Sequence, residues 1–299
     1  MEKEEFINHL TPSSLAISDE WKIASIDHEL LFNFEPLPVV AYITPELRLP
    51  PLPVQLDLDG SNRLIEIIYN SWIEYKEYGR NEKSPIIQGK SRSLSFSIDY
   101  GNFVMGGIVW LKVVATVRYP NGHFGILQNT FYSNIRGKNP TKEIIRDRLN
   151  NIELQVTAYR ESRFRQFDQE GKPLFGAPNG FGIMQIDNPP ATITQIWNWQ
   201  LNIDAGKALW AQKTKDAETY PSRVRTQYPS ATDFTPDELK LETYQRYNGG
   251  AYWKWDDQAK KWVKSPPNNY AEESIRIESL ILSGNIPNDW NTIDMNNWV

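Results

Sequence analysis

Residues 158–187 read AYRESRFRQFDQEGKPLFGAPNGFGIMQID, and this stretch decides how the C-terminal half of the chain folds. Its first residues continue an apolar pattern that is typical of a helix, and the residues that follow form a polar segment. Its last part, Gly180–Asp187, is apolar and contains two glycines. We therefore expect a helix, a polar loop and a buried turn, with the carboxylate of Glu161 where the helix meets the loop.

The predicted helix begins at Asn139-Pro140. Asparagine caps helices, and proline suits the first helical position because no N–H is needed there. Apolar residues then recur at alternating spacings of four and three, at Ile145, Leu149, Ile152, Val156 and Tyr159. This periodicity predicts a single amphipathic helix of about six turns.

Glu161 extends an apolar line of this helix. Leu154 and Ala158 precede it at spacings of seven and three, so its side chain is expected near apolar neighbours. Partial desolvation raises the pKa of a carboxyl and suits it to donating a proton near neutral pH. On helix geometry alone, the competing interpretation is a solvated glutamate at a helix end.

Three segments downstream of Asn139 stand in a recognisable order. Glu161-Ser162, Gly182–Ile186 and Tyr247–Gly250 resemble the Glu-Ser, Gly-Leu-Met-Gln and Ala-Tyr-Asn-x-Gly motifs of soluble lytic transglycosylases, which belong to the lysozyme-like superfamily with goose-type lysozyme. Asn202–Gly206 is similar to the Asn-Ile-x-x-Gly segment of that family. The resemblance covers about residues 139–283. Arg246 departs from it, because the family has alanine there, and the loop before Gly180 is longer than usual.

The resemblance implies cleavage of the β-1,4 bond of peptidoglycan glycan strands, with Glu161 as the catalytic acid and a 1,6-anhydro-muramic product. It implies no metal and no cofactor. By resemblance, Ser162 and Gln185 contact the substrate, and Met184 shapes the floor of the cleft. Tyr247 and Asn248 position Glu161 or the sugar.

Two other interpretations stay open. If Asp168, Glu170 or Asp187 faced Glu161 across the cleft with room for a water, the enzyme would be a hydrolytic muramidase or a chitinase-like hydrolase. Asp168 and Glu170 read more naturally as a polar turn. The other is a non-catalytic glycan-binding protein whose active site has decayed. The retention of Glu161, Gln185 and Tyr247 argues against it.

The N-terminal half has a different pattern. Gly107–Tyr119 and His123–Ile135 are apolar runs joined by Pro120-Asn121-Gly122, and Asn-Gly is a strong signal for a hairpin. With shorter strand-like runs before them, they predict an immunoglobulin-like β-sandwich. His123 is expected to be a solvated turn residue. Prolines recur between residues 36 and 53 and favour a linker, or an edge along a neighbouring domain.

The expected fold class is therefore α+β, with a β-sandwich followed by a mainly α-helical lysozyme-like domain. The predicted boundaries are residues 1–53 for an N-terminal segment and Pro-rich linker, 54–138 for the sandwich, and 139–299 for the lysozyme-like domain. Within the last, Thr235–Glu238 is a capping box, Trp253–Trp262 a hairpin and Asn269–Leu282 the last helix. Most of the eight tryptophans after Asn139 are expected in the core. Two of the eight, Trp290 and Trp298, fall in a polar tail, Gly284–Val299.

Composition limits the location and the partners. The net charge is −5 with no long basic run, so we expect no nucleic-acid partner, and the absence of cysteine excludes disulfides and thiolate metal sites. We expect neither a secretory signal nor a membrane span. The expectation is a protein that is cytoplasmic in its producer and acts in the periplasm or cell wall. An injected effector, for example of type VI secretion, is favoured over a phage enzyme or a fragment of a longer protein, and implies a secretion apparatus and an immunity protein.

Overall fold

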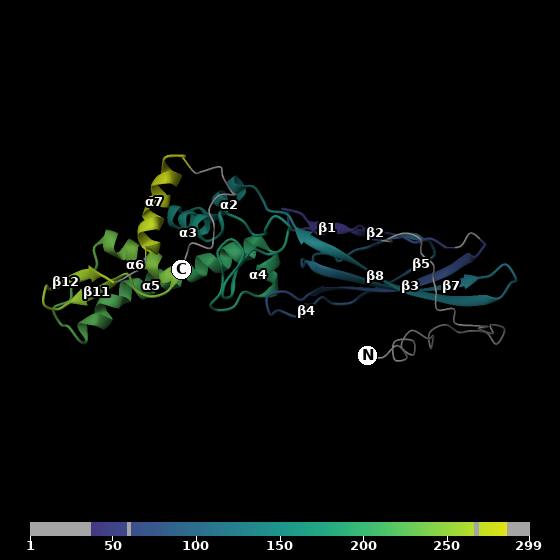
Figure 1. Ribbon diagram of the computed structural model, residues 1–299, viewed down its shortest axis with the longest axis horizontal. Helices are drawn as coiled ribbons and strands as arrows, with labels where there is room; N and C mark the ends of the chain where they lie inside the picture. Colours follow the sequence, from purple (N-terminus) through teal and green to yellow (C-terminus); the bar gives the residue numbers. More distant parts are fainter. Residues whose placement is uncertain (1–36, 59–60, 266–268, 286–299) are drawn as a thin grey trace. The chain divides into compact units, whose positions relative to one another are not determined.

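The computed structural model describes residues 37–58, 61–265 and 269–285, and combines α-helices with β-sheets as the sequence predicted (Figure 1). The chain forms two compact units. The first takes in the described residues up to Tyr42 together with Leu49–Ile135, and the second takes in Ile43–Arg48 and the described residues from Arg136 onward. Residues 1–36 lie outside the described residues. The same holds for the predicted polar tail from residue 286 onward, which includes Trp290 and Trp298.

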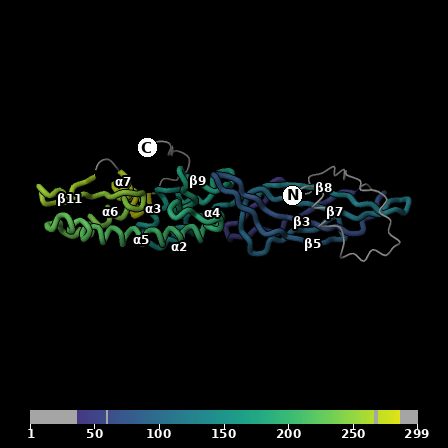
Figure 2. The backbone as a smooth tube through the Cα atoms, turned by 90° about the horizontal axis from the view of Figure 1, so that it is seen from below, coloured from purple at the N-terminus to yellow at the C-terminus, as the bar shows by residue number. Residues whose placement is uncertain are grey.

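A six-stranded sheet dominates the first unit. Its path is β1-β8-β7-β3-β4, with β5 also paired to β3, and the long strands run side by side (Figure 2). The strands are β1 (Val40–Ile43), β3 (Arg63–Tyr75), β4 (Glu82–Lys83), β5 (Ile87–Ser91), β7 (Gly107–Arg118) and β8 (Phe124–Gly137). The hairpin predicted from Asn121-Gly122 is confirmed as β7 and β8. His123 lies exposed beside the turn, as expected.

A two-stranded sheet, β2 (Leu52–Gln55) with β6 (Ser95–Ile98), packs on one face of the larger sheet. Tyr69 of β3 stacks on Phe96 with ring centroids 4.8 Å apart. Ser71, two residues further along β3, shares a 2.6 Å hydrogen bond with the Tyr100 hydroxyl. Side chains alternate along a strand, so the face of β3 that carries Tyr69 and Ser71 faces the core of this unit.

The proline-rich segment is more regular than the sequence suggested. Proline density was expected to prevent ladder pairing, yet Val40–Ile43 forms β1 between Pro38 and Pro45. The strand lies at the edge of the sheet, beside β8. An edge strand needs ladder bonds on one side only, so flanking prolines are compatible with it. The expected linker thus contributes structure.

The second unit is mainly helical. The helix α5 packs along α6, and α7 packs on both α3 and α6 (Figures 1 and 2). The helices are α2 (Lys142–Leu149), α3 (Ile152–Ser162), α4 (Ile193–Trp197), α5 (Trp199–Arg225), α6 (Pro236–Asn248) and α7 (Tyr270–Leu282). Two short antiparallel pairs complete it: β9 (Phe175–Gly176) with β10 (Gly180–Phe181), and β11 (Trp253–Asp256) with β12 (Lys261–Lys264).

The single helix predicted from Asn139 to Glu161 is wrong, because the chain breaks it into α2 and α3. Asn150 adopts the left-handed conformation with φ 51°, and the Asn151 side chain accepts from the Leu154 N–H at 2.9 Å as a new N-cap. Asparagine tolerates both roles better than most residues. Thr141, and not Asn139, caps α2.

Other local predictions are confirmed. Thr235 and Glu238 form a reciprocal capping box at the start of α6, and Gly249 ends that helix with φ 106°. The predicted hairpin is β11–β12, and the last helix is α7 with Asn269 at its N-cap position. Of the six tryptophans after Asn139 that the structure describes, four lie in the core, as expected for most of them; they are Trp197, Trp199, Trp255 and Trp262.

Candidate active site

Glu161 lies in the last turn of α3, where the backbone reverses sharply. The next turn contains two consecutive residues with positive φ, Arg163 at 59° and Phe164 at 61°. Neither is glycine, and a left-handed backbone at such a residue stores roughly 1–3 kcal/mol of strain. Packing holds the turn in place: Phe164 is buried against Tyr159 with ring centroids 5.6 Å apart. The chain thus fixes the end of α3 at a conformational cost.

Ser162 joins α3 to the second motif. Its hydroxyl lies 3.0 Å from the Ala158 carbonyl and 2.9 Å from the Ile183 carbonyl, and it accepts from the Arg165 N–H at 3.2 Å. The side chain is 1% exposed. Ser162 therefore holds the two motifs together, and the substrate contact expected from the resemblance would require these bonds to change.

The second motif is a tight turn locked onto α5. Met184 is fully buried, and its N–H donates to Asn202 Oδ1 at 2.9 Å. A Cβ added to Gly206 would stand 2.3 Å from Met184 Cγ, so glycine is needed for this close approach. Gln185 has φ 46° and donates from Nε2 to the Gly182 carbonyl at 2.8 Å. The segment Asn202–Gly206, which was singled out only by its similarity to a family segment, therefore supports the turn at Met184.

The third motif reaches the second through Tyr247. Its hydroxyl donates to the Met184 carbonyl at 2.8 Å, and its ring lies 5.8 Å from that of the half-buried Trp210. Burial raises the pKa of Tyr247 well above its ordinary value, and the charges of Glu161 and Asp187 raise it further. Asn248 is the exposed last residue of α6. The structure therefore brings Glu161, Met184 and Tyr247 together, while the Asn248 side chain is exposed.

Tyr270, which the sequence did not single out, contacts Glu161 directly. Its hydroxyl donates to Glu161 Oε1, and its ring lies 4.0 Å from the Arg160 guanidinium carbon. Tyr270 is the first residue of α7 and is buried. Its place near the start of the predicted last helix was readable from the sequence, but its partner Glu161 lies 109 residues away. No local pattern carries that pairing.

The surroundings raise the pKa of Glu161. Desolvation is the largest cause, and the charge of Asp187 acts in the same direction. The hydrogen bond from Tyr270 and the charge of Arg160 oppose the rise because they stabilise the carboxylate, but burial wins. Glu161 is therefore disposed to hold a proton at higher pH than an ordinary glutamate, as the sequence argument expected.

The other two candidate carboxylates form a turn. Asp168 Oδ1 accepts from the N–H groups of Glu170 at 2.8 Å and Lys172 at 2.9 Å, and Glu170 pairs with the Lys172 ammonium at 3.2 Å. The expected polar turn is confirmed. Asp187, in contrast, is exposed and acts on the charge state of both Glu161 and Tyr247.

Replacing Tyr270 by phenylalanine is expected to raise the pKa of Glu161 further. The change removes a hydrogen bond to the charged form and keeps the ring that desolvates it. Carbon-13 NMR of the labelled glutamate carboxyls measures the shift. Tyr244→Phe is the matched control, since its hydroxyl lies 3.3 Å from Glu278 instead. An unchanged or lowered pKa in Tyr270→Phe would contradict the assignment.

Within residues 37–58, 61–265 and 269–285, no group of three or more histidine, aspartate and glutamate side chains is arranged to hold a metal ion. In the same ranges, no helix has the length and apolar character needed to cross a membrane. Comparisons with protein-family models, with curated proteins and with solved structures found no match for this chain.

Proposed function

We propose that the protein is a peptidoglycan lytic transglycosylase, with Glu161 as its acid and base. In this proposal the second unit is a lysozyme-like domain and the first an immunoglobulin-like sandwich. The observation that carries the proposal is the convergence of three segments that are distant in sequence. The Tyr247 hydroxyl reaches the Met184 carbonyl at 2.8 Å, and the Ser162 hydroxyl reaches the Ile183 carbonyl at 2.9 Å, beside Glu161.

The geometry supports one carboxyl acting twice. A protonated Glu161 donates its proton to the leaving glycosidic oxygen, and the resulting carboxylate then removes a proton from the C6 hydroxyl of the muramic residue as that oxygen attacks C1. Tyr270 stabilises the carboxylate between the two steps through its hydrogen bond to Oε1. The C6 hydroxyl belongs to the same sugar as C1 and is held close to it, so the reaction needs no second carboxylate to activate a water.

Hydrolysis is the second candidate, and one observation favours it. The charge of Asp187 raises the pKa of Glu161, so the two carboxyls share an electrostatic environment. Asp187 is exposed, and an exposed carboxylate near the acid is the element that an inverting hydrolase needs to activate water. Asp187 comes directly after the second motif, so the same turn that presents Met184 sets its position.

The expected product of peptidoglycan digestion ends in 1,6-anhydro-muramic acid, which is lighter than the reducing product by one water. Mass spectrometry of the digest separates the two. Asp187→Asn should keep the anhydro product. It should also lower the pKa of Glu161 toward its ordinary value, because it removes a neighbouring negative charge. Reducing ends that disappear in Asp187→Asn would instead make the enzyme a muramidase with Asp187 as its base.

A further inference from the structure

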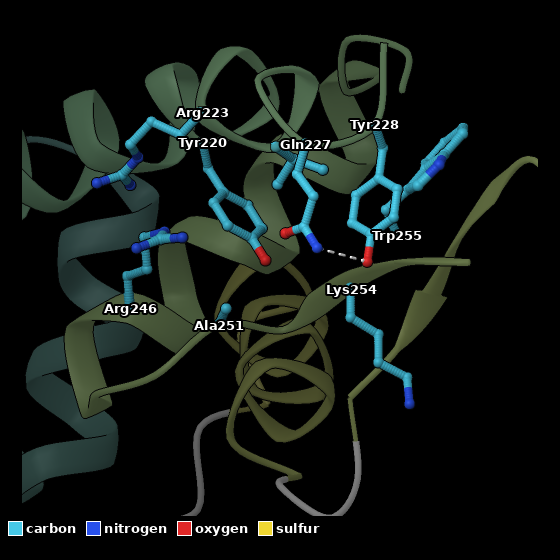
Figure 3. Close-up of a pocket in the computed structure, with 9 residues that line it drawn as sticks. Tyr220, Arg223, Gln227, Tyr228, Arg246, Ala251, Lys254 and Trp255 are labelled. Carbon is cyan, nitrogen blue, oxygen red and sulfur yellow. Dashed lines mark hydrogen bonds between the residues drawn. The ribbon is translucent and has the colours of Figure 1, made fainter. Parts of the chain in front are cut away.

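A pocket lies on a different face of α6 from Tyr247. Its volume is about 660 Å³, which falls in the range of small-ligand sites. Figure 3 shows its lining. It comes from the C-terminal part of α5 and the turn after it, from the end of α6, and from β11 with Ala251 shortly before that strand. The lining residues are Tyr220, Arg223, Val224, Gln227, Tyr228, Arg246, Ala251, Lys254 and Trp255.

The pocket is cationic. Its nine described lining residues include Arg223, Arg246 and Lys254 and none that carries a carboxylate. Both guanidinium groups flank one ring: the carbon of Arg246 lies 4.7 Å and that of Arg223 5.8 Å from the centre of Tyr220 (Figure 3). Glu242 pairs with Arg246, so the positive charge of the lining in excess of that pair comes from Arg223 and Lys254.

Arg246 is held in place and retains a free donor. Its guanidinium pairs with the fully buried Glu242 at 2.6 Å, which fixes one edge. Its Nε is buried and has no hydrogen-bond partner in the described part of the chain. A guanidinium stacked on an aromatic ring keeps its in-plane N–H groups for a carboxylate. Arg246 is also the position where the sequence departs from the lytic transglycosylase motif.

Aromatic side chains give the pocket a rigid apolar wall. Tyr220, Tyr228 and Trp255 line it and also pack in a cluster around Trp262. The ring centroids of Trp255 and Trp262 are 5.3 Å apart, and those of Tyr220 and Trp262 are 5.7 Å apart. The wall suits methyl and methylene groups, while the two guanidiniums suit a carboxylate. The combination fits a short anionic peptide.

We propose that this pocket binds the carboxylate-bearing peptide stem of peptidoglycan. The identity of the ligand rests on the proposed function, because the stem is attached to the muramic sugar whose bond that enzyme cleaves. Asn248–Gly250, which join Tyr247 to Ala251 of the pocket along the chain, are exposed. The pocket would therefore read the peptide while Glu161 acts on the glycan.

Calorimetric titration of the full chain with the pentapeptide L-alanyl-γ-D-glutamyl-L-lysyl-D-alanyl-D-alanine tests this proposal. Arg223→Ala should weaken binding at least about tenfold, because it removes a charge-assisted contact, and Arg223→Glu should weaken it more. Lys215→Ala is the matched control, since Lys215 is an exposed cation of the same helix outside the pocket. The pentapeptide with amidated carboxyls should bind as weakly to the wild type as the free acid binds to Arg223→Ala.

Three results would overturn the proposal: no binding of the free acid at millimolar concentration, equal binding of acid and amide, or equal loss in Arg223→Ala and Lys215→Ala. Tighter binding of glycerol phosphate than of the pentapeptide would assign the pocket to a phosphate ligand and overturn the peptide. The titration needs no cleavage, so its outcome is independent of Glu161. A Glu161→Gln protein that still cleaves glycan would instead count against the proposed function alone.

Discussion

Glu161→Gln is expected to fold normally and to cleave peptidoglycan about 10²–10⁴ times more slowly than the wild type. The amide keeps the shape of the carboxyl and can still accept from the Tyr270 hydroxyl. It cannot donate a proton to a leaving oxygen and later take one back. Release of soluble fragments from purified peptidoglycan measures the rate, and near-normal turnover would remove Glu161 from the mechanism.

The same variant should be at least as stable as the wild type at neutral pH. The folded pKa of Glu161 is raised, so its contribution to the free energy of unfolding is fully present below the unfolded pKa and is lost as pH rises through the folded value. Glutamine does not ionise, so the variant does not lose this free energy of unfolding as pH rises. Glu153→Gln, at the other end of α3, is the control: the same substitution there should leave the rate of cleavage unchanged.

Much of the site could be predicted because its motifs are short and local. Thr235-Pro236 and Asn248–Gly250 mark the two ends of α6, so the sequence alone placed Tyr247 near a helix terminus. The order of Glu161, Gln185 and Tyr247 suggested a common site. The burial of Ser162 was not predictable. Its hydroxyl bonds to the carbonyl of Ala158 in its own helix and to that of the distant Ile183, and the second contact exists only in the folded chain.

The remaining features depend on contacts between distant segments. The apolar stripe of α2 and α3 stays in phase across the break at Asn150-Asn151, so periodicity could not reveal the break. The sequence did not single out Tyr270 at the start of α7, and its hydroxyl meets Glu161 only in the folded chain. Residues Val40–Ile43 form an edge strand although prolines flank them, because the strand β8 beside them supplies the partner.

Glu242→Ala is expected to lower the free energy of unfolding of the second unit by about 3–5 kcal/mol. Glu242 is fully buried, and its carboxylate accepts from the N–H groups of Tyr252 at 2.8 Å and Trp253 at 3.0 Å while it pairs with Arg246 at 2.6 Å. Alanine leaves a mostly buried guanidinium and two amides without their acceptor. Hydrogen exchange at the Tyr252 and Trp253 amides reports the loss locally, and denaturant unfolding reports it globally.

The matched control is Glu273→Ala, which removes a pair with Arg276 whose side chains are 33% and 60% exposed and should cost no more than about 1 kcal/mol. Equal stability of the two variants would show that Glu242 holds nothing in place.

The double variant Glu242→Gln with Arg246→Met separates the two parts of this cost. The glutamine oxygen can still accept from both amides, and methionine removes the cation that would otherwise be buried alone, so stability should return to within about 1–2 kcal/mol of the wild type. This variant should nevertheless lose the pentapeptide, since one of the two guanidiniums beside Tyr220 is gone. A folded protein without peptide binding would show that Arg246 serves the pocket and is not required for the fold. A variant that remains as unstable as Glu242→Ala would show instead that the ion pair itself is indispensable to the fold.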